Sequence, residues 1–100
     1  MSSSLEVLSK SVIESIVFDM DFSKQLSTAE TISSITSVVS VIQNRVESST
    51  NITIGIPVSS GAVVQFRISD GYLGECYEVT AIIVTSNGNT REGSGILIIE

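Results

Sequence analysis

The chain has 100 residues, with 11 acidic and 5 basic side chains, a formal net charge of −6 and no histidine. Without histidine there is no imidazole base or ligand, and the single cysteine, Cys76, excludes an internal disulfide framework and a cysteine-rich zinc site. The few scattered basic residues argue against nucleic-acid binding, and no apolar run reaches the roughly 18 residues of a membrane span. Val, Ile and Thr together supply 34 residues, and these β-branched side chains favour strands.

Residues 1–15 are rich in serine and carry four spaced apolar side chains, namely Leu5, Leu8, Val12 and Ile13. Their spacing is compatible with a short amphipathic helix, although no companion surface is evident. We expect an N-terminal arm over residues 1–15 that is flexible or becomes ordered on a partner, and a folded domain over residues 16–100. A simple frayed terminus is the alternative. No basic stretch precedes a long apolar run here, so no secretory signal is expected.

Residues 16–22 alternate with a period of two, which predicts a half-buried strand. Phe18, Met20 and Phe22 face one way, whereas Asp19 and Asp21 face the other. Two carboxylates on one face are compatible with a divalent cation, but a solvated strand face explains them better, and no metal or cofactor is predicted.

The middle of the chain predicts two further strands. In residues 31–42, the adjacent Val38 and Val39 indicate a bulge or burial on both faces. Residues 52–56 place three isoleucines on one face, and Pro57 ends the strand because proline has no N–H to donate to a ladder.

The C-terminal third alternates most clearly. Residues 62–69 and 76–86 each place every second side chain, mostly apolar, on one face. Residues 86–93 (SNGNTREG) predict a hairpin loop, since Asn and Gly tolerate positive φ. The inward side chains are expected to be Val64, Phe66 and Ile68, followed by Tyr77, Val79, Ala81 and Ile83.

Six or seven short strands with regular turn signals, and no helical pattern between them, predict the fold class. It is an all-β fold, a small antiparallel β-sandwich of immunoglobulin-like or fibronectin-like type, preceded by the N-terminal arm. Gly74 predicts a tight turn before the longest strand. Tyr77, three residues later, has the spacing of a tyrosine corner, in which the phenol bonds to an upstream backbone group; a plain core tyrosine is the alternative.

Two strands near the C-terminus are apolar on both faces, although each strand of a sandwich has one core face and one outer face. Since residues 86–93 join these strands, we expect Ile82, Val84, Leu97 and Ile99 to form one outward apolar patch that binds a partner. The alternative is that the N-terminal arm folds back over the patch within the same chain.

Three segments resemble one family of phage proteins. FDMDFSKQL, AETISSITSVV and RISDGYLGECYEVTAIIVTSNGNTREGSGILIIE resemble, in order and spacing, the small tailed-bacteriophage virion proteins called fibre-tail adaptors. The resemblance covers roughly residues 15–100. It implies an Ig-like virion protein, made in the host cytoplasm, that docks in several copies on other neck, tail, fibre or capsid subunits.

The resulting hypothesis is a non-enzymatic virion protein that docks through its apolar sheet face and N-terminal arm at a neck, tail or fibre junction. No cofactor, nucleic acid or membrane is expected as a partner. A capsid cement protein of the same fold is the first alternative, and an Ig-like module that binds carbohydrate or a cell surface is the second.

Overall fold

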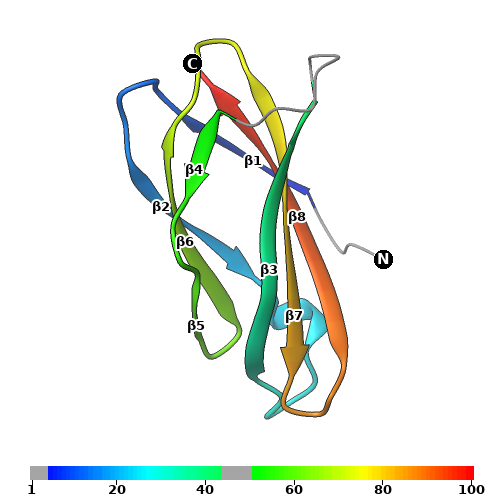
Figure 1. The fold of residues 1–100 in the computed structure, drawn as a ribbon. Coiled ribbons are helices and arrows are strands. Elements are labelled where there is room, and N and C mark those ends of the chain that lie inside the picture. The colour runs from blue at the N-terminus through cyan, green and yellow to red at the C-terminus, as the bar shows by residue number, and fades with distance from the viewer. Residues whose placement is uncertain (1–4, 44–50) are drawn as a thin grey trace.

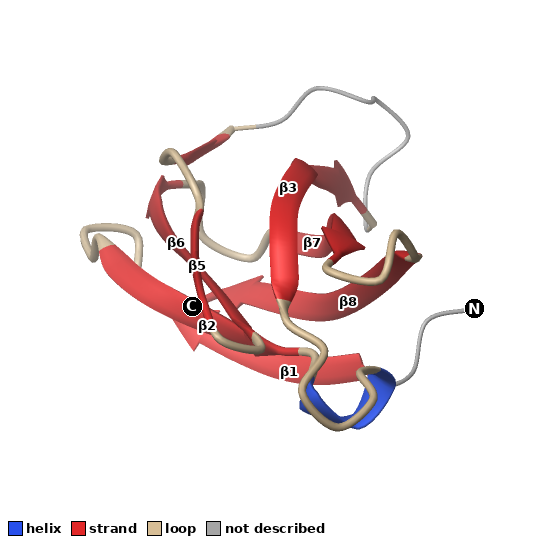
Figure 2. Cartoon of the chain, turned by 90° about the horizontal axis from the view of Figure 1, so that it is seen from below, coloured by secondary structure: helices blue, strands red, loops and turns tan. Residues whose placement is uncertain are grey.

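The computed structural model describes residues 5–43 and 51–100, whose strands form two sheets that pack face to face (Figures 1 and 2). This arrangement confirms the predicted small β-sandwich. It departs from the prediction in having eight strands among the described residues rather than six or seven, and in one parallel pair, β1 with β8. The described helical structure is one 3-10 turn, η1 (Ser23–Gln25). No helix in the described ranges is both long and apolar enough to cross a membrane.

Four strands form each sheet. Sheet A has the order β1–β8–β7–β3, with the bounds Leu5–Lys10, Thr90–Ile99, Cys76–Thr85 and Ile32–Ile42. Sheet B has the order β2–β6–β4, with β5 also paired to β6, and its strands are β2 (Ile16–Asp21), β6 (Val63–Asp70), β4 (Ile52–Ile54) and β5 (Val58–Ser60).

The topology is that of an immunoglobulin-like sandwich. In chain order, β2, β4 and β6 take the places of strands B, D and E, and β3, β7 and β8 take those of C, F and G. The first strand differs, because β1 runs parallel to β8 in sheet A rather than beside β2 in sheet B.

Part of the expected arm over residues 1–15 is a strand of the folded domain in the structure. Leu5–Lys10 form an edge strand of the sandwich and not a helix or a separate arm, while residues 1–4 lie outside the described residues. In this serine-rich stretch only Leu5 and Val7 alternate as in a strand. This short pattern did not indicate a parallel pairing with a strand about 90 positions away in the chain.

The core lies between the two sheets. Its centre is formed by side chains at most 2% exposed, from β6, β7, β8 and the residue after β2: Phe22, Val64, Phe66, Ile68, Tyr77, Val79, Ala81, Ile83, Leu97 and Ile99. The alternation predicted for residues 16–22, 62–69 and 76–86 is therefore present.

Three local features depart from the sequence prediction. Strand β8 begins at Thr90, inside the expected hairpin loop. The irregularities of β3 lie between Ile32 and Ser37, and not at Val38 and Val39. In addition, Ile56 does not share a face with Ile52, because β4 ends at Ile54 and the side chain of Ile56 is 91% exposed.

Gly93 in β8 makes the close approach of the two sheets possible. It is buried, and a Cβ atom at this position would lie 3.0 Å from Met20 Sδ and 3.0 Å from Phe22 Cζ. The missing side chain leaves room for the Phe22 ring, which is fully buried.

We predict that Gly93→Ala lowers the free energy of unfolding by about 1–3 kcal/mol, since an added methyl group overpacks a filled core. Gly55→Ala is the matched control, because its Cβ would lie 3.6 Å from the nearest atom, in ordinary contact. Urea unfolding of both variants measures the difference. A Gly93→Ala protein as stable as Gly55→Ala would contradict this account of the packing.

Candidate docking surface

The outer face of sheet A, the face turned away from the core, carries aliphatic side chains among serine, threonine and glutamate residues. Pairing registers place on it seven apolar side chains from all four strands: Val7, Val39, Val41, Ile82, Val84, Ile96 and Ile98. Val7 is 71% exposed, Val41 54%, Val39 49% and Ile98 38%, and the other three are half-buried. We call these seven residues the outer apolar face.

The sequence prediction for this face was right for β7 and wrong for β8. Ile82 and Val84 lie on it, but Leu97 and Ile99 are 0% and 1% exposed in the core. The reason is the register, in which Leu97 lies opposite the core residue Tyr77. Side chains opposite each other in a ladder share a face, so Ile96 and Ile98 point outward instead.

Two carboxylates lie on this side of sheet A: the exposed Glu92, opposite Ile82, and Glu78 among the apolar side chains. Glu78 is half-buried and pairs with Ile96 on β8 and Val41 on β3, while Val7 pairs with Ile96 from the other side. The row across the sheet is therefore Val7, Ile96, Glu78 and Val41. A partner that covered this row would remove water from around a negative charge, which favours a partner with a cationic group at that point.

The N-terminal residues expected at the interface do not lie together. Leu8 packs against the core, and Val12 and Ile13, 40% and 93% exposed, lie in the connection from β1 to β2. The side chain of Leu5 lies outside the described residues. Within the described part of the chain, β1 extends sheet A at the edge of β8 and does not cover its outer face (Figure 2). Val7, which sequence reasoning missed, is the β1 residue that belongs to this face.

A buried carboxylate organises the turn before β7. Glu75 and Tyr77 are both fully buried, and the Tyr77 hydroxyl donates to Glu75 Oε1 (2.8 Å) and accepts from the backbone N–H of Asn51 (3.0 Å). Asn51 Nδ2 donates to Glu75 Oε2 (2.6 Å), and the Tyr72 N–H donates to Glu75 Oε1 (2.8 Å). The tyrosine thus reaches an upstream backbone group, at the start of β4.

Gly74 and Phe66 occupy structural positions. Gly74 has φ +88, a conformation that side chains of L-residues rarely adopt, and its N–H donates to the carbonyl of Ile99 (2.9 Å). Phe66 is 2% exposed on β6. These residues shape the scaffold behind the outer apolar face and do not belong to it.

A second carboxylate ties the loop before β3 to the β7–β8 hairpin. Glu30 is 6% exposed and accepts hydrogen bonds from the Ser27 N–H (2.8 Å), the Thr85 hydroxyl and Asn89 Nδ2 (3.1 Å). The bond from the Ser27 backbone and that from Thr85 hold the pKa of Glu30 below its ordinary value, against the opposing effect of burial.

The strand-face aspartates have local partners. Asp19 accepts from Gln65 Nε2 (3.0 Å), and Asp21 accepts from the Ser23 N–H (2.8 Å), a bond that lowers the pKa of Asp21. Among the described residues, no group of three or more His, Cys, Asp or Glu side chains lies close enough to hold a metal ion.

The sequence profile of the family described as podophage GP4 fiber-tail adaptor protein gp77 matches residues 10–98. The match spans both sheets and nearly nine-tenths of the chain, and it confirms the resemblance noted from the sequence. Among curated proteins, none matches the chain in sequence.

We predict that Leu97→Ala lowers the free energy of unfolding by about 2–5 kcal/mol, because it leaves a cavity in the core. Ile98→Ala, one residue later on the outer face, is the control and should cost about 1 kcal/mol or less. Urea unfolding of both variants tests the β7–β8 register, and equal losses would contradict it.

The pH dependence of the free energy of unfolding tests the role of Glu30. Because its folded pKa is lowered, its stabilisation is complete above the unfolded pKa of about 4.3 and is lost as the pH falls through the folded value. Glu30→Gln should therefore be less stable than the original protein near neutral pH, and the difference should shrink in acid. Urea unfolding at several pH values measures it, with the exposed Glu92→Gln as control. A difference that stayed constant with pH would be inconsistent with an ionised Glu30.

Proposed function

Because the chain belongs to the podophage fibre-tail adaptor family, we propose that it docks on a neighbouring tail or fibre protein through the outer apolar face. As a member of this family it is a structural protein of the phage particle, and the proposal concerns how it binds. We propose that the protein connects its neighbours without changing conformation, because its rigid sandwich presents a preformed binding surface.

The proposal rests on the aliphatic side chains that sheet A carries on its outer face in addition to those on its core face. One face already fills the core, as the full burial of Tyr77, Val79 and Leu97 shows. The seven residues of the outer apolar face are thus left over after folding, on all four strands of one sheet. Within this set, Val7 lies opposite Ile96, with Ile98 next on the same face of β8. Neighbouring apolar side chains left on a surface usually mark a partner interface.

Glu78 favours a different protein as the partner over a second copy of the same face. A twofold pairing centred on Glu78 would bring two half-buried carboxylates together, and like charges in an interface cost several kcal/mol. A tail or fibre protein with apolar side chains around a Lys or Arg would match both the outer apolar face and the negative charge of Glu78.

Strand β1 extends the surface. It adds Val7 to the outer apolar face through its parallel pairing with β8. Since β1 is the edge strand of sheet A in the described residues, its other edge can accept a strand from the partner. We propose that Leu5–Lys10, within the expected arm of residues 1–15, takes part in docking in this way.

The carbohydrate-binding alternative has little support from the aromatic side chains. The chain has five aromatic residues, and four of them, Phe18, Phe22, Phe66 and Tyr77, lie in the core. Tyr72 is 60% exposed, but one ring offers a small stacking platform. The capsid cement alternative would use the same face and differs in copy number and position on the particle.

We predict that Val41→Lys weakens docking by at least about tenfold, since it places a charge in the apolar face and repels the cation expected opposite Glu78. The measurement is the number of copies per purified particle, by quantitative mass spectrometry, when the variant replaces the original protein. Thr53→Lys, an exposed position on β4 of sheet B, is the matched control.

Both purified variants should retain the original melting temperature within a few degrees, because both positions are exposed on strands. The lysine of Thr53→Lys can pair with Asp70, whose carboxylate accepts from the Thr53 hydroxyl (2.7 Å). Incorporation of Val41→Lys at the original copy number would contradict the proposed docking face, and so would an equal loss with Thr53→Lys.

A further inference from the structure

A small groove on the opposite side of the molecule arises where the edge of sheet B is interrupted. The Gly55 N–H still donates to the Arg67 carbonyl (2.8 Å), and Val58 again pairs with Gln65. Between them, Pro57 has no N–H to continue the ladder. The chain bends away from β6 at this point, which turns the Ile56 side chain outward.

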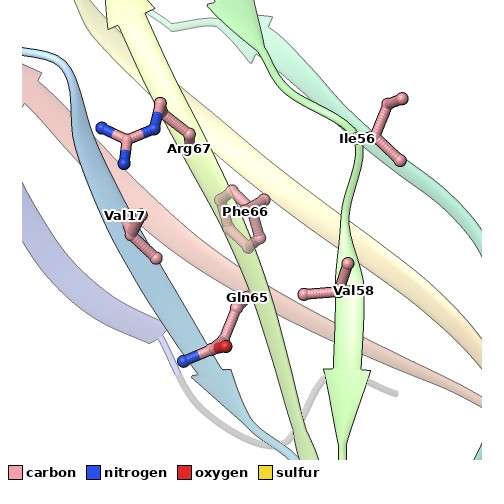
Figure 3. A pocket seen from close by; sticks show the side chains of 6 residues that line it. All are labelled: Val17, Ile56, Val58, Gln65, Phe66 and Arg67. Carbon is pink, nitrogen blue, oxygen red and sulfur yellow. The ribbon is translucent and has the colours of Figure 1, made fainter.

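The groove is apolar on both walls. Val17 from β2 forms one wall, Ile56 and Val58 form the other, and β6 runs between them with Gln65, Phe66 and Arg67 (Figure 3). Val17, Ile56 and Val58 are 49%, 91% and 55% exposed, so three aliphatic side chains meet water around one hollow. Its volume of about 200 Å³ is below the roughly 300–1,000 Å³ of small-molecule pockets, and suits a single side chain.

Arg67 gives the groove a positive charge. Its Nη1 donates to the Ser15 carbonyl (2.8 Å) and approaches the Ser15 hydroxyl (3.4 Å), which fixes the guanidinium beside β2. A guanidinium has five N–H donors in a fork that matches a carboxylate, and both of these contacts use one nitrogen. None of the described residues that line the groove carries a carboxylate, and the nearby carboxylate of Asp19 accepts a hydrogen bond from Gln65 Nε2 (3.0 Å).

We propose that this groove is a second docking site, which receives one aliphatic side chain from an extended partner segment and binds the adjacent carboxylate of that segment through Arg67. This second site is separate from the proposed docking surface, because the groove lies on sheet B, away from the outer apolar face. A protein that joins two components needs two binding surfaces, and this one differs in charge from the surface around Glu78.

The test uses the full protein, labelled with ¹⁵N, and the peptide acetyl-Gly-Leu-Glu-Gly-amide as the probe. We expect saturable shifts of the amide signals of Val17, Val58 and Arg67, with a millimolar dissociation constant as befits so small a ligand. The peptides acetyl-Gly-Leu-Lys-Gly-amide and acetyl-Gly-Ser-Glu-Gly-amide should bind at least about fivefold more weakly, because each lacks one of the two recognised groups.

Two variants locate the site. Arg67→Gln should weaken binding about tenfold, as expected for loss of a charge-assisted pair, whereas the exposed Arg91→Gln should bind the peptide normally. Val58→Ser removes part of the aliphatic wall while the contacts of Arg67 with Ser15 remain, and it should also weaken binding. Their amide spectra report whether each variant stays folded.

Several results would overturn the proposal. These are the absence of saturable shifts at peptide concentrations of tens of millimolar, equal binding of the three peptides, or unchanged binding by both Arg67→Gln and Val58→Ser. Shifts of the same signals on raising the protein concentration without peptide would instead identify a second copy as the occupant. None of these results bears on particle incorporation of Val41→Lys, so the two proposals can fail separately.

Discussion

The register between β7 and β8 is the constraint on which the rest of the structure depends. Leu97 lies opposite Tyr77, and from this pair the alternation assigns every apolar side chain of the two strands to the core or to the outer face. A slip of one residue would exchange the two sets. The observed register buries Leu97 and Ile99 completely or nearly so and leaves Ile96 and Ile98 for a partner, so the same pairing produces both the core and the proposed docking surface.

Two buried carboxylates hold the ends of β7, the central strand in this arrangement. Glu75, before its first residue, binds Tyr77 and Asn51, and Glu30 binds Thr85, its last residue. Both carboxylates join segments distant in the chain, where loops would otherwise be free to move. The outer apolar face is therefore presented by a strand fixed at both ends, which suits a joint that binds without changing shape.

The sequence predicted the fold best where polar and apolar residues alternate, as in β6 and β7. It was wrong for the faces of β8, because four consecutive aliphatic residues, 96–99, carry no polar side chain to mark the outside. The start of β8 was predicted too late because Gly93 was interpreted as part of a turn. In the structure this glycine lies within the strand and makes room for Phe22. The groove on sheet B was missed because the outward turn of Ile56 depends on the break in pairing around Pro57, which alternation alone does not reveal.

If the proposed docking is correct, the outer apolar face is buried in the particle against a tail or fibre protein. Cryo-electron microscopy of intact virions, at a resolution that places side chains, tests it most directly. Copies of the protein should lie at the tail, with Val41, Ile96 and Ile98 covered by apolar residues of the neighbour. A Lys or Arg of that neighbour should form an ion pair with Glu78. An outer apolar face open to solvent, or copies distributed over the capsid shell, would contradict the proposed docking.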